Sequence, residues 1–149
     1  MASVLRAVLD TNVLLAAARS NHTTSPTAEI LDRWQSHEFE LLVSLDTLSE
    51  YAEKLLSHGV SASEVEAFLT TLAVHAKLVT VAFFHFRHYP VDPDDVMFLL
   101  CAINGRATHL VSYDNHLRSL SSFYESELKI CEPLEFLAEC RAANSRPTS

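Results

Sequence analysis

Short apolar segments alternate with longer amphipathic segments along most of this chain. The short segments have the length and hydrophobicity of buried strands, and they cover residues 5–9, 39–43, 78–83, 109–112 and 128–131. Between them, apolar residues recur every three or four positions, which predicts helices over residues 12–18, 26–37, 44–58, 65–74, 96–103 and 133–140, with a short one after residue 114. Because strands alternate with helices, we predict an α/β fold, a three-layer α/β/α sandwich with a mostly parallel central sheet of four to five strands.

Helix boundaries are marked by residues that start or end helices. Ser61 or Ser63 is placed to cap the helix that carries residues 65–74. Residues 92–95 (Asp-Pro-Asp-Asp) combine an Asp cap, a proline at the first helical position and an acid in capping-box position. The helix that follows is apolar on every side and ends at Gly105, so we expect it to lie in the centre of the fold.

Four acidic residues fall close to strand ends, where parallel sheets position functional groups. Asp10 directly follows the first strand, Asp114 follows the fourth, and Asp95 opens the central helix. Glu50 lies within the helix after the second strand, and its long side chain can reach the same edge. Four separate segments therefore deliver acids to one rim of the sheet.

Three of these acids also have ordinary structural interpretations. Asp95 is placed to be the second arm of a capping box, and Asp114 is placed to cap a helix that begins at Asn115. Glu50 has the character of a solvated helix residue. Asp10 has no obvious structural role, because it ends a buried strand and precedes another apolar run.

Carboxylates crowded at one rim raise one another's pKa unless a cation neutralises them. Oxygen ligands of this kind suit Mg²⁺ or Mn²⁺, which also take phosphate oxygens as ligands. One or two such ions activate water and stabilise the leaving oxygen when a phosphodiester is cleaved. The four acids therefore predict a metal-dependent nuclease site.

The overall charge and composition add constraints. With 149 residues the chain is the size of one domain, which we place at residues 4–140, followed by a polar tail at 141–149. The net charge of −8, from 11 basic and 19 acidic residues, is unusual for a protein that binds phosphates. Metal ions, a short substrate or a basic partner protein would each reconcile the charge with the predicted chemistry.

The remaining motifs point to a cytoplasmic protein without further metal sites. No apolar stretch is long enough to span a membrane, and the N-terminus lacks the pattern of a signal peptide. The three cysteines, Cys101, Cys131 and Cys140, have no CxxC spacing, and we expect Cys101 to be a buried free thiol. His85 and His88 form an HxxH pattern without a second ligand pair, which argues against a zinc site.

Three stretches of the sequence resemble the PIN-domain family. LRAVLDTNVLLAA is similar to its first motif, with Asp10 as the acid, and SLDTLSEYAEKL is similar to its second, with Glu50. VDPDDVMFLLCAINGRATHLVSYDNHL resembles the third and fourth motifs, with Asp95 and Asp114. The resemblance runs from residue 5 to about residue 137 and is strongest to the toxin components of bacterial toxin–antitoxin systems.

This resemblance implies a Mg²⁺- or Mn²⁺-dependent endoribonuclease that acts on RNA, forms a homodimer or higher homo-oligomer, and is blocked by a cognate antitoxin protein. It also implies supporting roles for Asn12, which would orient the site, and for Ser112. The sequence departs from the family where Val96 and Met97 replace an Asp and a Lys. It departs again at His116, which stands in place of an Asp and would weaken a second metal site or contact phosphate. Asp92 would then serve as an outer ligand.

Two alternatives remain open from the sequence. A phosphohydrolase of the haloacid-dehalogenase type also begins with an Asp after its first strand, but its Asp-x-Asp motif is interrupted here by Asn12. A non-catalytic module of the same fold would keep the acids and act by binding RNA or protein. Affinity for Mn²⁺ would separate this module from an enzyme.

Overall fold

Five parallel strands form the central sheet of the computed structural model, which describes residues 4–19, 25–82, 90 and 92–144. The strands are β1 (Arg6–Leu9), β2 (Glu40–Val43), β3 (Lys77–Leu78), β4 (His109–Val111) and β5 (Lys129–Cys131). Their order in the sheet is β3-β2-β1-β4-β5, so β1 lies at the centre between β2 and β4. The predicted α/β class and parallel sheet are confirmed.

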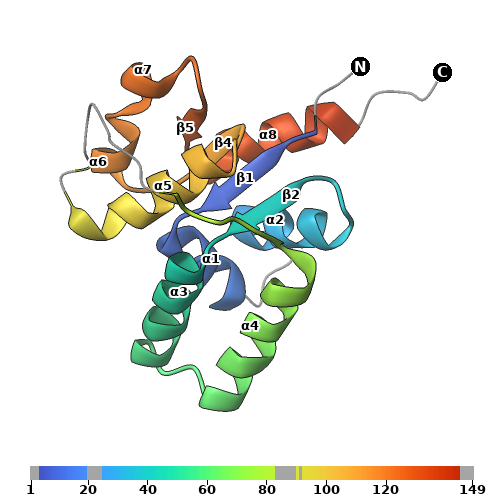
Figure 1. Cartoon of the computed structure of the whole chain (residues 1–149). Helices are drawn as coiled ribbons and strands as arrows, with labels where there is room; N and C mark the ends of the chain where they lie inside the picture. The colour runs from blue at the N-terminus through green and yellow to red at the C-terminus, as the bar shows by residue number, and fades with distance from the viewer. Residues whose placement is uncertain (1–3, 20–24, 83–89, 91, 145–149) are drawn as a thin grey trace.

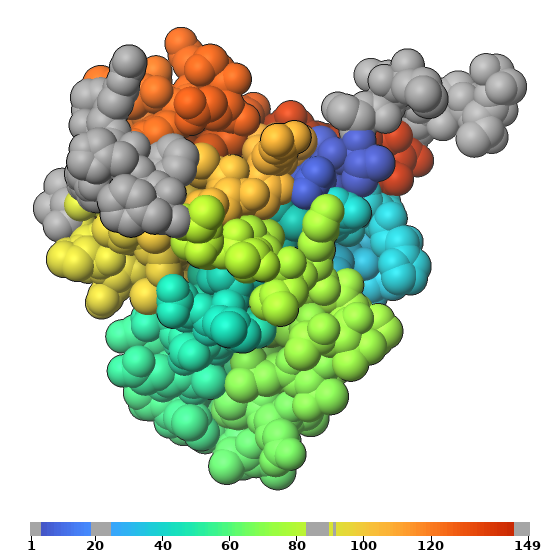
Figure 2. Space-filling model, in the orientation of Figure 1, coloured from blue at the N-terminus to red at the C-terminus, as the bar shows by residue number. Residues whose placement is uncertain are grey.

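Helices cover both faces of this sheet (Figure 1). They are α1 (Thr11–Arg19), α2 (Pro26–Gln35), α3 (Leu45–Ser57), α4 (Ala62–His75), the 3₁₀ turn η1 (Pro93–Asp95), α5 (Val96–Asn104), α6 (Asn115–Arg118), α7 (Ser121–Tyr124) and α8 (Pro133–Asn144). The apolar helix α5 packs against β1, β2 and β4, while α8 packs against β4 and α2. Helices α3 and α4 form a hairpin that makes up the lower part of the molecule in Figure 2.

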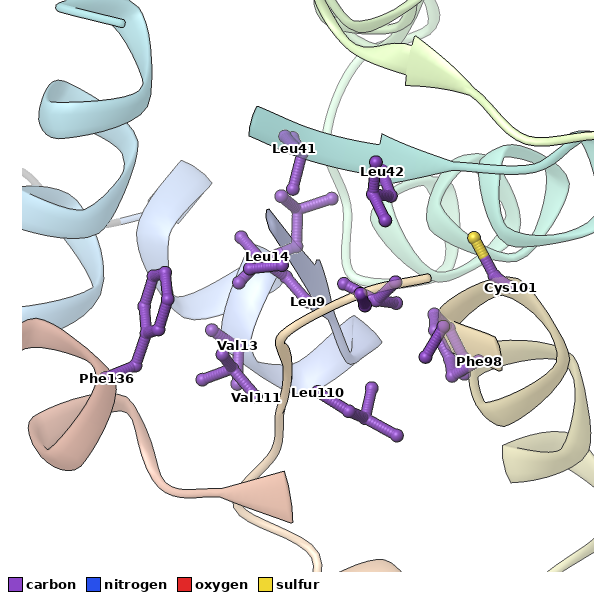
Figure 3. Close-up of a cluster of buried hydrophobic side chains, with 14 of the residues drawn as sticks. Leu9, Val13, Leu14, Leu41, Leu42, Phe98, Cys101, Leu110, Val111 and Phe136 are labelled. Carbon is purple, nitrogen blue, oxygen red and sulfur yellow. The ribbon is translucent and has the colours of Figure 1, made fainter. Parts of the chain in front are cut away.

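The core lies on both sides of the three central strands. Figure 3 shows Phe98 of α5 on one side of these strands and Phe136 of α8 on the other. Leu9 and Leu110, which lie between them, are fully buried. Each such side chain contributes about 1.5–3 kcal/mol on burial, so the short apolar segments hold the strand ends in fixed positions.

A capping box starts α3 at the carboxyl end of β2. The Ser44 hydroxyl accepts a hydrogen bond from the Thr47 amide at 3.2 Å, and the Thr47 hydroxyl accepts one from the Ser44 amide at 2.8 Å. Since both residues are buried, this box sets the direction in which α3 leaves the sheet. It therefore also sets the direction of Glu50 further along the helix.

Two predicted segments differ from the structure. We expected a third strand over residues 78–83, but β3 has only two residues, both exposed at the sheet edge. Its pairing is extended by one bond, from the Val79 amide to the Val43 carbonyl at 2.7 Å. We expected the last helix to end at residue 140, but α8 continues to Asn144, and in this extension Arg141 forms an ion pair of 2.7 Å with Glu29 of α2.

Other expectations concern single residues. Ser61, not Ser63, caps α4. Cys101, Cys131 and Cys140 are buried free thiols. The histidines of the HxxH pattern lie outside the described residues. Of the helices in the described ranges, none combines the length and the apolarity needed to cross a bilayer.

Candidate functional site

An acidic cleft of about 190 Å³ opens at the carboxyl edge of the sheet. Its described lining residues are Asp10, Thr11, Asn12, Glu50, Lys54, Asp92, Asp94, Asp95, Phe98 and Asp114. The cleft thus brings together all four acids singled out in the sequence, and the structure places them after the three adjacent strands β2, β1 and β4 and at the start of α5. The metal-binding roles of these acids stay a prediction.

Asp10 forms the floor of the cleft and is only 5% exposed. Its Oδ1 accepts a hydrogen bond from the Thr11 amide, and its Oδ2 accepts one from the Ser112 hydroxyl, each at 2.7 Å. Burial raises the pKa of Asp10, and these two hydrogen bonds act in the opposite direction. The two hydrogen bonds fix the orientation of the Asp10 carboxylate.

Ser112 links Asp10 to Asp114. While its hydroxyl donates to Asp10, its oxygen accepts from the Asp114 amide at 2.9 Å. Asp114 in turn accepts at Oδ1 from the His116 amide at 2.8 Å, so its predicted capping role is real. Only one of its two oxygens is used for capping in this way, and the carboxylate also lines the cleft. Ser112 therefore lies beneath the site, as a support rather than a lining residue.

Asp95 contributes a buried carboxylate to the cleft. It is 6% exposed, and its Oδ2 is buried without a hydrogen-bond partner among the described residues. Asp92 caps η1 by accepting from the Asp94 amide, and no capping box with Asp95 is formed among the described residues. The capping-box interpretation of Asp95 is therefore wrong. Burial, followed by the charges of Asp10 and Asp114, raises the pKa of Asp95 to about 7.

Glu50 and Lys54 reach the cleft from consecutive turns of α3. The Glu50 side chain is 11% exposed, and its Oε1 lies 4.0 Å from the Lys54 ammonium nitrogen. Burial raises the pKa of Glu50, and the Lys54 charge opposes this rise. Glu50 is thus not the solvated helix residue that its sequence position allowed.

Tyr51 ties α3 to the end of β1. This fully buried side chain donates a hydrogen bond of 2.5 Å to the Leu9 carbonyl, one residue before Asp10. Its ring also lies 5.9 Å from the ring of Phe98 on α5. One side chain therefore sets the spacing between the elements that carry Glu50, Asp10 and Asp95.

Two of the remaining supporting residues predicted from the sequence line the cleft, and one does not. Asn12 and Asp92 line the cleft with exposed side chains, and Asp92 also caps η1 by accepting from the Asp94 amide. His116 is exposed and is not among the described lining residues. Lys54 and Asp94 line the cleft but were not identified beforehand. The spacing of four residues between Glu50 and Lys54 was the available signal for the lysine.

The donor set suits a hard divalent cation. All the acids offer oxygen ligands, as Mg²⁺ and Mn²⁺ prefer, and the buried Oδ2 of Asp95, which has no partner among the described residues, is a group that a cation would satisfy. Within the described ranges, however, no three acidic, histidine or cysteine side chains already stand in the arrangement of a finished metal site. The acids share a cleft without forming a closed set of ligands.

This chain is similar to known proteins in family and in fold. A model of the PIN domain matches residues 6–116, a range that contains the whole cleft. Twelve chains of solved structures match this fold. One of them comes from the crystal structure of VapBC2 from Rickettsia felis bound to a DNA fragment from their promoter. That chain has a TM-score of 0.55 and 11% identity, and the match covers 86% of this chain and 98% of that one. Among curated proteins, none matches this sequence.

Proposed function

This chain belongs to the PIN domain family, and we propose that it is a divalent-metal-dependent endoribonuclease. One observation carries the proposal: Asp95 has a buried carboxylate oxygen without a partner among the described residues, and it lines the same cleft as Asp10, Glu50 and Asp114. Such crowding destabilises the ionised acids unless a cation is bound. The fold alone would not support this function, because one fold hosts many activities.

Asp10, Glu50, Asp95 and Asp114 would hold one or two ions of Mg²⁺ or Mn²⁺. When bound, these ions supply Lewis-acid activation of water and neutralise the charge that develops on the phosphodiester. The chain itself orients Asp10 through Ser112 and the Thr11 amide. Asp95, whose pKa is raised to about 7, would have to be ionised to act as a ligand of such an ion. Asn12 and Asp92, both exposed at the cleft, are placed to act as outer contacts.

Asp10→Asn tests this proposal. We expect metal-stimulated cleavage of a single-stranded RNA oligonucleotide to be lost while the circular dichroism spectrum is retained. Asp32→Asn is the matched control, because Asp32 is an exposed acid of α2 that does not line the cleft. If Asp10→Asn cleaves RNA as fast as the Asp32 control, the assignment of the site is wrong.

A binding-only module is the second candidate. It is favoured by the absence, within the described residues, of three acids already arranged around an ion. Titration calorimetry with Mn²⁺ separates the two candidates, since a binding-only module need not take up metal. The haloacid-dehalogenase alternative is set aside, because the chain belongs to a different family.

The resemblance to toxins and the fold likeness to VapBC2 support a further part of the proposal, a cognate antitoxin protein that covers the cleft. The net charge of −8 suits a basic partner. Reading the neighbouring open reading frame and co-purifying its product would test the pairing. Homo-oligomerisation and a cytoplasmic location belong to the same proposal. Sedimentation analysis of the purified chain would test the first of these.

A further inference from the structure

We propose that Lys54 is the residue of this site that contacts the substrate backbone, with its ammonium group binding a phosphate of the RNA beside the carboxylates. This inference rests on the proposed nuclease function and adds a specific substrate contact to it. Three features of the cleft support it: the position of Lys54 on α3, the charge balance of the cleft, and the pairing of the chain's other basic residues.

Lys54 lies at the outer part of the cleft. It follows Glu50 by four residues, so it stands about one helical turn, or roughly 6 Å, further along α3. The Lys54 side chain is 42% exposed, whereas the Glu50 side chain is only 11% exposed. The ammonium group is therefore reachable by a ligand that enters from solvent, while Glu50 faces the interior of the site.

The charge of the cleft favours a phosphate contact by Lys54. Six carboxylates line it, and among the described lining residues Lys54 is the one cation. Metal ions can neutralise the deeper acids, but the phosphates on either side of the cleaved bond still pass over an acidic rim. A lysine at that rim provides a contact that is independent of RNA sequence.

Among the basic residues whose side chains the structure describes, five besides Lys54 are paired with acids away from the cleft. The ion pairs are Arg6–Glu40, Arg33–Glu29, Arg33–Glu38, Arg118–Glu132, Lys129–Glu139 and Arg141–Glu29. Lys54 also has an acidic neighbour, but the 4.0 Å separation from Glu50 is loose. A separation of 4.0 Å is at the outer limit of an ion pair, so Lys54 is not held tightly by Glu50 and its exposed ammonium group is available to a phosphate.

Substrate contact and structural support predict opposite effects on metal affinity. If Lys54 contacts phosphate, removal of its charge weakens RNA binding but leaves Mn²⁺ affinity unchanged or higher, because a positive charge near the ion is lost. If Lys54 merely positions Glu50, its removal lowers Mn²⁺ affinity. The sign of the change in Mn²⁺ affinity therefore distinguishes the two roles.

The experiment compares Lys54→Gln and Lys54→Arg with the wild-type chain. Lys77→Gln is the matched control, since Lys77 is an exposed lysine of β3 that does not line the cleft. Mn²⁺ affinity is measured by calorimetry. Binding of a single-stranded RNA oligonucleotide is measured by fluorescence anisotropy in Ca²⁺ over a range of salt concentrations.

We expect Lys54→Gln to weaken RNA binding by about tenfold, as for loss of one charged hydrogen bond. The slope of the logarithm of the RNA-binding constant against the logarithm of salt concentration is negative. Its magnitude should decrease by about 0.7, the value for one phosphate contact on a single strand. Lys54→Arg should retain both the affinity and the slope, and the control should resemble wild type.

Two outcomes would overturn the inference. If the wild-type chain binds Mn²⁺ and cleaves RNA but Lys54→Gln leaves the salt slope unchanged or lowers Mn²⁺ affinity, the Lys54 contact is wrong and the nuclease proposal stands. If the wild-type chain neither binds Mn²⁺ nor cleaves RNA, the proposed function fails and the Lys54 contact fails with it.

Discussion

Replacing Asp95 by Asn should stabilise the metal-free protein, although the same change should abolish the proposed activity. Asp95 is buried, its Oδ2 has no hydrogen-bond partner among the described residues, and the charges of Asp10 and Asp114 oppose its ionisation. Asn has nearly the same shape but carries no charge. The variant therefore removes the repulsion and leaves the packing of the cleft in place.

The magnitude follows from the pKa. Burial and repulsion raise the pKa of Asp95 from its ordinary value of 3.8 to about 7. Each pKa unit corresponds to ~1.4 kcal/mol, so the ionised carboxylate lowers the free energy of unfolding by at most about 4 kcal/mol. Because the neighbouring acids titrate together with Asp95 and can share the proton, we expect about 2 kcal/mol to be recovered.

The dependence on pH identifies the cause. A carboxyl group whose pKa is raised in the folded state favours folding while it is protonated, and this contribution disappears as the pH rises through the folded pKa. The stability advantage of Asp95→Asn should thus be small near pH 4, grow between pH 4 and pH 7, and stay constant above that range. Loss of a packing contact would give no such dependence on pH.

Urea denaturation in EDTA at pH 5 and pH 8 measures the effect. Asp94→Asn is the control, because Asp94 is the adjacent acid and is exposed. With saturating Mn²⁺ the wild-type chain should become more stable than Asp95→Asn, since a ligand at 100 times its Kd stabilises the chain that binds it by about 2.7 kcal/mol. An Asp95→Asn variant that is no more stable than wild type at pH 8 in EDTA would refute the electrostatic account.

Two further substitutions test how the cleft is supported. Tyr51→Phe removes the buried hydrogen bond of 2.5 Å to the Leu9 carbonyl and should lower the free energy of unfolding by about 1–3 kcal/mol, measured by urea denaturation; a loss well below this range would mean that the bond does not hold α3 to β1. Gly105→Ala would place a Cβ 2.7 Å from the Val79 Cγ2 and 2.9 Å from the Leu42 Cδ1. It should cost about 1–3 kcal/mol through overpacking, and an unchanged melting temperature would contradict the close approach.

The positions of Asp10 and Asp114 were predictable because the signals are local. Each follows a short apolar segment that is buried on both faces of the sheet. A segment of this kind is identifiable as a strand, so the residue that follows it is placed at the carboxyl edge of the sheet. The third strand was less predictable. The apolar run at residues 78–83 has strand character, but only Lys77 and Leu78 form a strand at the sheet edge. The length of this strand depends on its pairing with β2, which is distant in the sequence.

The choice among neighbouring acids could not come from their pattern alone. Asp92, Asp94 and Asp95 follow one another at a helix start, yet only Asp95 is buried. The inward turn depends on the 3₁₀ geometry of η1, which a capping pattern does not specify. Lys54 was missed for a related reason: whether a residue one turn after Glu50 faces the cleft depends on how Tyr51 fixes α3 against β1, and that contact joins distant parts of the chain.

The supports of the cleft explain how a fold can tolerate so many acids at one edge. A penalty of a few kcal/mol is large beside the roughly 5–15 kcal/mol that stabilise a typical domain. Ser112 and the Thr11 amide offset part of it at Asp10, but no equivalent donor among the described residues reaches the Oδ2 of Asp95. The repulsion at Asp95 is therefore left for a cation to remove, and the free energy released then adds to that of cation binding. For this reason, a variant that removes the charge of Asp95 should gain stability in the metal-free state and lose affinity for the cation.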